Sequence, residues 1–198
     1  LQPIFELTGM PALRQREPGF AGLAAFVCGQ QLSTASASAI WGRLTAAFNP
    51  FDPEPIRKAR AERLGQLGLS AAKIKTLKNI ARELAAERLN LDVLAEEDAD
   101  AAHHTLTALH GIGPWTADVY LLFCLGHGDA WPAGDIAIQE AVKVGLGLST
   151  RPTISPTVRK PSSVAARKTR MAISLRLATS NLRWGGGGEN DLGVGTFE

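Results

Sequence analysis

Apolar residues recur at helical spacing through most of the first 150 residues. Ile74, Leu77 and Ile80 follow one another at intervals of three residues, which places them on one face of a helix, and Ser70 and Asp98 each precede such a segment as N-cap residues. No series of alternating strand positions and no repeat of fixed period interrupts this pattern. It therefore predicts an all-α body. The expected helical segments are Pro18–Cys28, Ser33–Phe48, Pro55–Leu67, Ser70–Leu89, Asp98–Leu109, Trp115–Leu125 and Asp135–Leu146.

The segment LTALHGIGPWTA, residues 106–117, connects two of these expected helices. Gly111 and Gly113 tolerate backbone angles that are closed to other residues, and they leave no side chain between the backbone and a ligand. Ile112 is expected to point into the core, and Pro114 suits the first position of the second helix. The amides left facing outward form a site for one phosphate, blind to base sequence. A G-x-G sequence by itself would indicate only an ordinary turn between helices.

Composition and charge narrow the function classes. Apolar residues make up 45% of the 198 residues, which is enough for a buried core, and aromatic residues make up only 6%. The net charge of +2 divides into −3 for residues 1–150 and +5 for residues 151–198. Because the body is acidic overall, DNA binding by it has to depend on local geometry more than on a general positive field.

The chain has two cysteines, Cys28 and Cys124, each within an apolar run. They are expected to be buried free thiols in a reduced, cytoplasmic protein, and two are too few for a four-cysteine zinc site or an iron–sulfur cluster. No run approaches the roughly 20 apolar residues of a membrane span, and no signal-peptide pattern is found.

Residues 151–198 differ in character from the rest, so we expect a domain over 1–150 followed by a basic tail that ends in glycines. Residues 151–183 contain eight basic residues and no acidic one. A flexible basic tail is the favoured interpretation, and an arm that binds phosphates nonspecifically is the alternative. A further hypothesis is that this tail is foreign to the fold, for instance through a change of reading frame.

The L-x-x-L-x-G-I-G-x-x-T-A spacing resembles the hairpin of the helix-hairpin-helix (HhH-GPD) base-excision DNA glycosylases, and is most similar to the DNA-3-methyladenine glycosylase II branch. The family's Gly/Pro-rich loop matches residues 126–134, GHGDAWPAG, and its characteristic aspartate matches Asp135. Residues 29–33, GQQLS, resemble the segment that inserts into the duplex. The resemblance covers roughly residues 18–150. It implies a two-lobed helical bundle with a cleft between the lobes.

The resemblance also assigns contacts to DNA. It implies phosphate binding by the amides of Gly111, Gly113 and Thr116. It implies a duplex wedge at Gln31, with Leu32 beside it. A monovalent cation held by the carbonyls of Thr107, Leu109 and Ile112 is a further implication, and no other cofactor is required.

Excision of a base passes through a transition state with positive charge on the sugar, which a fixed carboxylate such as Asp135 stabilises while it orients the attacking water. The base must first leave the stack. Trp115 is the best candidate for the aromatic wall that receives it, through attraction of about 0.5–2 kcal/mol between an indole and a cationic alkylated base. Tyr120 and Trp131 are less direct candidates. Family members that also nick the strand carry a lysine where this chain has Trp115.

The sequence therefore predicts a monomeric, monofunctional glycosylase that excises alkylated bases of the 3-methyladenine type from duplex DNA in base excision repair. The alternatives are a noncatalytic helix-hairpin-helix module that binds DNA, or a glycosylase for another lesion. A helical protein-interaction domain fits the hairpin less well. For single residues the simpler interpretations are a pure N-cap for Asp135, a core aromatic for Trp131 and ordinary helix-end residues for Gln30 and Gln31.

Overall fold

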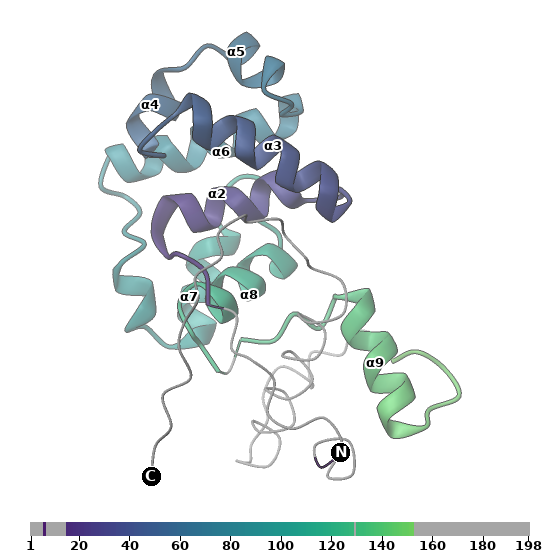
Figure 1. Cartoon of the computed structure of the whole chain (residues 1–198). Helices are drawn as coiled ribbons and strands as arrows, with labels where there is room; N and C mark the ends of the chain where they lie inside the picture. Colours follow the sequence, from purple (N-terminus) through teal and green to yellow (C-terminus); the bar gives the residue numbers. More distant parts are fainter. Residues whose placement is uncertain (1–5, 7–14, 129, 153–198) are drawn as a thin grey trace, which may run out of the picture.

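The computed structural model describes residue 6 and the ranges 15–128 and 130–152 (Figure 1). Within these residues it contains α-helices, one short 3-10 helix and no strand, so the all-α prediction is confirmed. The predicted basic tail lies outside the described residues from position 153 onward. None of the helices described here combines the length and the apolar character that crossing a bilayer requires.

The helices lie where the hydrophobic pattern predicts them, with ends shifted by a few residues. The charged segment over 55–67 is divided into two short helices by Ala59 and Arg60, which are both extended. The bounds are α2 Gly19–Gly29, α3 Thr34–Ala47, α4 Pro53–Lys58, α5 Ala61–Gln66, α6 Ala71–Ala85, η1 Val93–Ala95, α7 Ala99–Thr107, α8 Pro114–Phe123 and α9 Ile136–Leu146.

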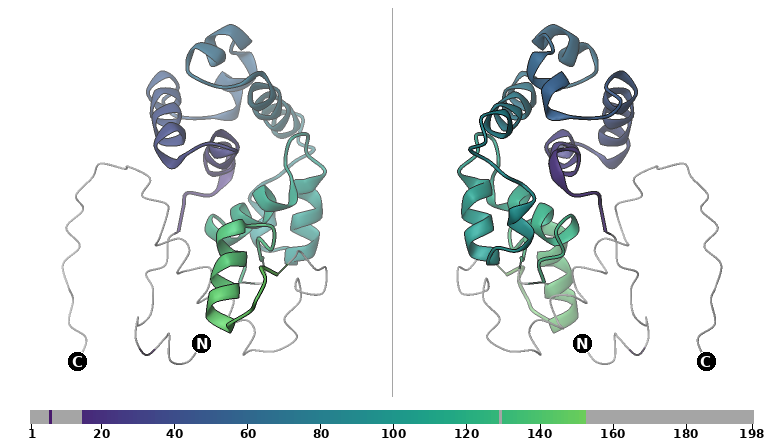
Figure 2. Two further views of the ribbon diagram at one scale, coloured as in Figure 1. Left: turned by 90° about the vertical axis from the view of Figure 1, so that its right-hand side faces the viewer. Right: turned by 90° about the vertical axis from the view of Figure 1, so that its left-hand side faces the viewer.

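The helices form two groups, α2–α6 and α7–α9, which the views from both sides separate clearly (Figures 1 and 2). Helix α2 packs on α3 and α6 in the first group and on α8 in the second, so it joins the two. Its apolar face explains this position, because Leu23, Ala24, Val27 and Cys28 are fully buried. Helix α9 extends away from α7 and α8.

Polar side chains determine where several helices begin. Ser70 accepts a hydrogen bond from Lys73 N, and Asp98 accepts one from Asp100 N, so both predicted N-caps are confirmed. Asp135 caps α9 in the same way. The caps matter for function because α9 begins at the candidate catalytic carboxylate.

Both cysteines are free and buried, as the sequence predicts. Burial raises the pKa of the Cys28 thiol to about 12 and that of Cys124 to about 12. Neither thiol is therefore a reactive group at neutral pH.

Candidate active site and nucleic-acid interface

The hairpin between α7 and α8 has the backbone that its glycines predict at one position only. Gly111 has φ +82°, and a Cβ there would collide with the Thr76 hydroxyl of α6. Gly113 has φ −88° and ψ 170°, which any residue adopts, and nothing lies within 4 Å of an added Cβ. The expectation of special backbone angles thus holds for Gly111 and is wrong for Gly113. At Gly113 the missing side chain instead leaves open surface for a ligand.

The rest of the hairpin is fixed by the core and by the start of α8. Ile112 is only 4% exposed and packs in the core, and Pro114 is the first residue of α8, as predicted. The first intrahelical bond of α8 runs from Ala117 N to Gly113 O at 3.0 Å. The Thr116 N–H therefore precedes the hydrogen-bonded part of the helix. With Gly111 and Gly113 exposed, this geometry is suited to an anion.

The turn that follows α2 presents the predicted wedge residues to solvent. Gln31 is exposed and Leu32 is 40% exposed. Gln31 has φ +56°, a left-handed conformation that is uncommon for a residue other than glycine. Such backbone strain is often found at binding sites.

The structure brings this turn against the hairpin through Gln30. Its Nε2 donates to Thr116 Oγ1 at 2.9 Å and to Gly111 O at 3.3 Å. On the other side of the turn, Lys73 Nζ donates to Cys28 O at 2.8 Å. Lys73 therefore caps the last turn of α2 with one of its three N–H donors, and its partial burial lowers its pKa.

The candidate catalytic carboxylate is held by three donors. Asp135 Oδ1 accepts from Ala137 N at 2.9 Å and from Ile138 N at 3.2 Å, and Oδ2 accepts from Trp115 Nε1 at 2.8 Å. Asp135 is thus an N-cap, as the simpler interpretation predicts, but only Oδ1 caps the helix, while Oδ2 accepts from the Trp115 indole. Because Trp115 is the second residue of α8, the carboxylate is tied directly to the hairpin helix.

The loop that carries Asp135 is anchored at several points. His127 Nε2 lies 2.7 Å from Leu94 O, which makes that ring nitrogen the donor. Gln139 Nε2 donates to Ala133 O at 2.8 Å, and Asp135 N donates to Pro132 O at 2.9 Å. The carboxylate is consequently positioned from both ends of its loop.

The other two aromatic candidates lie deeper than Trp115. Tyr120 is fully buried, accepts from Gly19 N at 3.1 Å, and has its pKa raised by burial. Trp131 is 6% exposed. Trp115 is only half-buried. A role for Tyr120 and Trp131 in a base pocket stays a prediction, and Trp115 is the aromatic that contacts Asp135.

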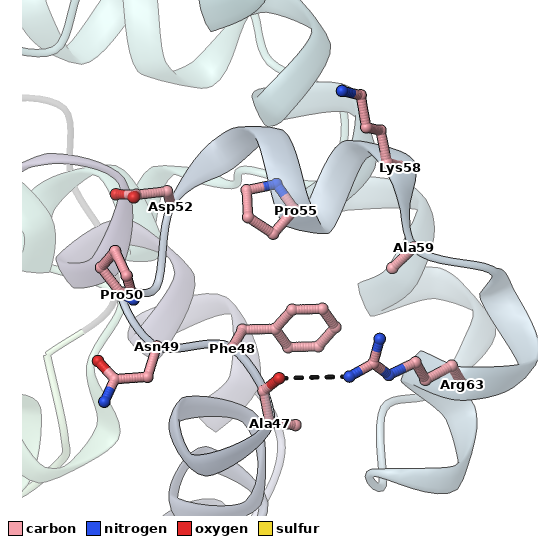
Figure 3. A pocket seen from close by; sticks show the side chains of 9 residues that line it. All are labelled: Ala47, Phe48, Asn49, Pro50, Asp52, Pro55, Lys58, Ala59 and Arg63. Carbon is pink, nitrogen blue, oxygen red and sulfur yellow. Dashed lines mark hydrogen bonds between the residues drawn. The ribbon is translucent and has the colours of Figure 1, made fainter.

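The surface hollows described in the structure lie elsewhere. One of about 470 Å³ separates the end of α3 from α4 and α5 (Figure 3). In it Arg63 lies over the Phe48 ring, 4.7 Å from its centroid, and donates to Ala47 O at 3.3 Å. A second, of about 1070 Å³, lies at the N-terminal end of α2. Neither is lined by Trp115 or Asp135, so the cleft expected between the lobes stays a prediction.

Sequence reasoning missed residues that join the site across long separations. Gln30 is 86 positions from Thr116, and Thr76 lies beside Gly111 from another helix. The sequence offered a partial signal, because Gln30 stands beside the predicted wedge. Nothing in the local pattern identified Thr76.

Comparison with known proteins agrees with this arrangement. A family model described as HhH-GPD superfamily base excision DNA repair protein matches residues 24–164. DNA-3-methyladenine glycosylase 1 of Schizosaccharomyces pombe is 32% identical over 154 residues, covering 72% of this chain and 64% of that protein. A probable bifunctional transcriptional activator/DNA repair enzyme AlkA of Mycobacterium tuberculosis is 36% identical over 136 residues, covering 62% of this chain. The chain spans only 26% of that longer protein.

Solved structures are similar as well. The S. pombe 3-methyladenine DNA glycosylase in complex with abasic DNA superposes with a TM-score of 0.74 at 26% identity, covering 89% of this chain and 87% of that one. A DNA-3-methyladenine glycosidase from Bacillus halodurans gives a TM-score of 0.72 at 27% identity, covering 89% and 81%. These likenesses extend over both groups of helices.

Proposed function

The chain belongs to the HhH-GPD superfamily of base excision DNA repair proteins, and on that basis we propose that it is a monofunctional DNA glycosylase that removes alkylated bases of the 3-methyladenine type from duplex DNA. The observation that carries the proposal is the hydrogen bond of 2.8 Å from Trp115 Nε1 to Asp135 Oδ2. It joins an aromatic surface and a carboxylate at the start of the hairpin helix. A module that only binds DNA has no need of that pair.

The Asp135 carboxylate stabilises the positive charge that grows on the sugar as the bond from C1′ to the base nitrogen breaks. It also orients the water that attacks C1′. Its three donors hold it in one orientation, so little reorganisation is needed during the reaction.

The indole of Trp115 donates its N–H to Asp135 in the plane of the ring, so this bond does not occupy either face of the ring. A cationic alkylated base is attracted to such a face. Alkylation also makes the base a good leaving group, so a general acid is not required. Because Trp115 occupies the position of the lysine nucleophile in strand-nicking members, the product is an abasic site in an intact strand.

Binding to DNA uses the hairpin and the turn after α2. The amides of Gly111, Gly113 and Thr116 contact one phosphate, and Gln31 with Leu32 fills the gap that the extruded base leaves. The exposed position of Gln31 and its left-handed backbone support this role.

Three finer assignments accompany this function. A monovalent cation would be held by the carbonyls of Thr107, Leu109 and Ile112. Thr107 is the last residue of α7, so its carbonyl lacks an intrahelical donor, and the Leu109 carbonyl accepts from Ile112 N at 3.1 Å. The protein acts as a monomer on damaged duplex DNA. It functions in the cytoplasm, a reducing compartment in which two buried free thiols persist.

The test is release of 3-methyladenine from methylated duplex DNA by the full chain and by Asp135→Asn. Asparagine is also a good N-cap residue, so the variant retains an oxygen for the α9 amides. It loses the charge, and its Nδ2 takes the place of the oxygen that accepts from Trp115 Nε1, so the indole bond is lost as well. We expect release to fall by about a hundredfold or more. Asp98→Asn, the same change at the N-cap of α7, is the matched control and should retain release.

Each other outcome contradicts a defined part of the proposal. Equal release by Asp135→Asn and the parent would remove Asp135 from catalysis. A parent that binds abasic duplex and releases no base would be a noncatalytic module. Strand breaks without alkali treatment would contradict the monofunctional assignment.

A further inference from the structure

The Gln30 side chain spans the space between the turn after α2 and the hairpin before α8. It uses one carboxamide nitrogen for two acceptors, Thr116 Oγ1 at 2.9 Å and Gly111 O at 3.3 Å. An amide nitrogen has two hydrogens, so both contacts are satisfied together. Thr116 is buried, which shields the shorter bond from competing water.

The turn itself needs such support. Gln30 has φ −52° and ψ 128°, Gln31 has φ +56°, and Leu32 N donates to Gly29 O at 3.3 Å. These values match a type II turn, whose third position favours glycine because its φ is positive. Gln31 occupies that position with a full side chain. Its conformation is therefore imposed by the surroundings and is not a local preference.

The surroundings hold the turn from two sides. Lys73 Nζ donates to Cys28 O, at the last turn of α2, and the Gln30 side chain reaches the hairpin. The hairpin in turn packs against α6, where His110 N donates to Asn79 Oδ1 at 3.3 Å. The turn, the hairpin and α6 are thus linked into one unit by named contacts.

We propose that Gln30 is a positioning residue that fixes the Gln31 wedge relative to the phosphate site of the hairpin, so that gripping the backbone and entering the duplex occur together. This inference rests on the proposed function. Gln30 acts through its neighbour, because its Nε2 is committed to protein acceptors while Gln31 is exposed. Without this link, the hairpin still binds phosphate, but the Gln31 side chain is no longer held at a fixed position relative to the phosphate site.

The experiment compares the full chain with Gln30→Leu, Gln31→Ala and the double variant. Leucine keeps a similar volume and removes both donors. Affinity is measured by fluorescence anisotropy for a duplex with a tetrahydrofuran abasic analogue and for an undamaged duplex of the same sequence. We expect Gln30→Leu to lose roughly tenfold on abasic DNA and less than about twofold on undamaged DNA. Gln66→Leu, at the exposed end of α5, is the matched control.

The double variant distinguishes positioning from direct contact. If Gln30 acts through Gln31, the double variant loses no more abasic affinity than Gln31→Ala alone. Additive losses would overturn the proposal, because they would make Gln30 an independent DNA contact. Equal losses on both duplexes would also overturn it, because they would show general damage to the hairpin.

Hydrogen exchange of the free proteins tests the link without DNA. We expect the amides of Gln31 and Leu32 to exchange several-fold faster in Gln30→Leu than in the parent, with no change in Gln66→Leu. Unchanged exchange would overturn the proposal even if DNA binding fell. A parent with no preference for the abasic duplex would contradict the proposed function, while the exchange rates would still decide whether Gln30 fixes the turn.

Discussion

Trp115 donates its indole N–H to Asp135 across 2.8 Å and thereby joins the start of α8 to the start of α9. The bond is the direct tie, among the contacts described, between the hairpin helix and the candidate catalytic carboxylate. It gives Trp115 two roles on one ring, because the edge holds the carboxylate while a face is available for the extruded base. Substitutions can separate the two roles.

Trp115→Phe keeps an aromatic face and removes the donor. We expect the kcat for base release to fall about tenfold, since Asp135 Oδ2 loses its partner and the carboxylate is less well fixed. Abasic DNA affinity should change little. Single-turnover release assays on methylated duplex give the rate.

The matched control is Trp41→Phe, because Trp41 packs on Phe51 with ring centroids 4.8 Å apart and does not contact Asp135. It should retain full release. A Trp115→Phe protein as fast as the parent would show that the indole bond does not position the carboxylate.

The two hairpin glycines should respond differently to alanine. Gly111→Ala places a side chain at φ +82° and against the Thr76 hydroxyl, so we expect the free energy of unfolding to fall by about 2 kcal/mol or more. Gly113→Ala has an ordinary backbone and open space, so its loss should stay below about 1 kcal/mol. Urea denaturation measures both.

For DNA binding, Gly113→Ala is the more informative of the two variants. The new methyl group of Gly113→Ala lies on the open surface where the phosphate is expected, so abasic affinity should fall about tenfold with the fold intact. Undiminished affinity in Gly113→Ala would argue against a phosphate at this point. Equal destabilisation of the two variants would show that Gly111 does not depend on its backbone angles.

The sequence predicted the helices, and it identified the hairpin and Asp135 as candidate site residues, because both leave local signals. The spacing of apolar residues depends on helix geometry, and the G-I-G hairpin and the loop before Asp135 are continuous segments. The Trp115–Asp135 bond, the Gln30 contacts and the clash of a Gly111 side chain with Thr76 involve residues 20 to 86 positions apart or on separate helices. Such contacts are determined by packing, so local pattern did not reveal them.

The division of residues 55–67 into α4 and α5 shows a second limit. Its charged, amphipathic pattern is compatible with one helix, yet Ala59 has ψ 142° and Arg60 has ψ 143°, which are extended values. Ile56 of α4 and Leu64 of α5 are both fully buried on the two sides of this break. Each short helix thus places its own apolar residue in the core.

Alkaline pH should destabilise the protein through its buried thiols. Burial holds the pKa of Cys28 at about 12 and that of Cys124 at about 12, above their ordinary value of 9.0. The unfolded chain releases these protons first, so stability is present below about pH 9 and is lost as the pH rises toward 12. The slope approaches about 1.4 kcal/mol per pH unit for each fully titrating thiol.

Urea denaturation at pH 8, 9 and 10 measures this slope. The double variant Cys28→Ala, Cys124→Ala should be less stable at pH 8 because it loses buried volume, but its stability should fall less steeply above pH 9. Parallel pH profiles for the two proteins would show that the thiols do not cause the decline.

Gln31→Gly should separate stability from function at the wedge. Glycine adopts φ +56° without strain, so the free energy of unfolding should stay level or rise by up to about 1 kcal/mol, the gain being offset in part by the greater entropy of the unfolded chain. The same change removes the side chain that fills the gap in the duplex. Base release and abasic affinity should therefore fall roughly tenfold in a protein that is no less stable.

Urea denaturation, abasic affinity and base release measured on one preparation decide the point. Glu87 has φ +55° and lies at the end of α6, so Glu87→Gly is the matched control for relief of strain away from the hairpin. It should show a similar change in stability with unaltered base release. If Gln31→Gly retained full release, a side chain at this position would not be needed to hold the base outside the helix, and the strain at Gln31 would have no connection with DNA.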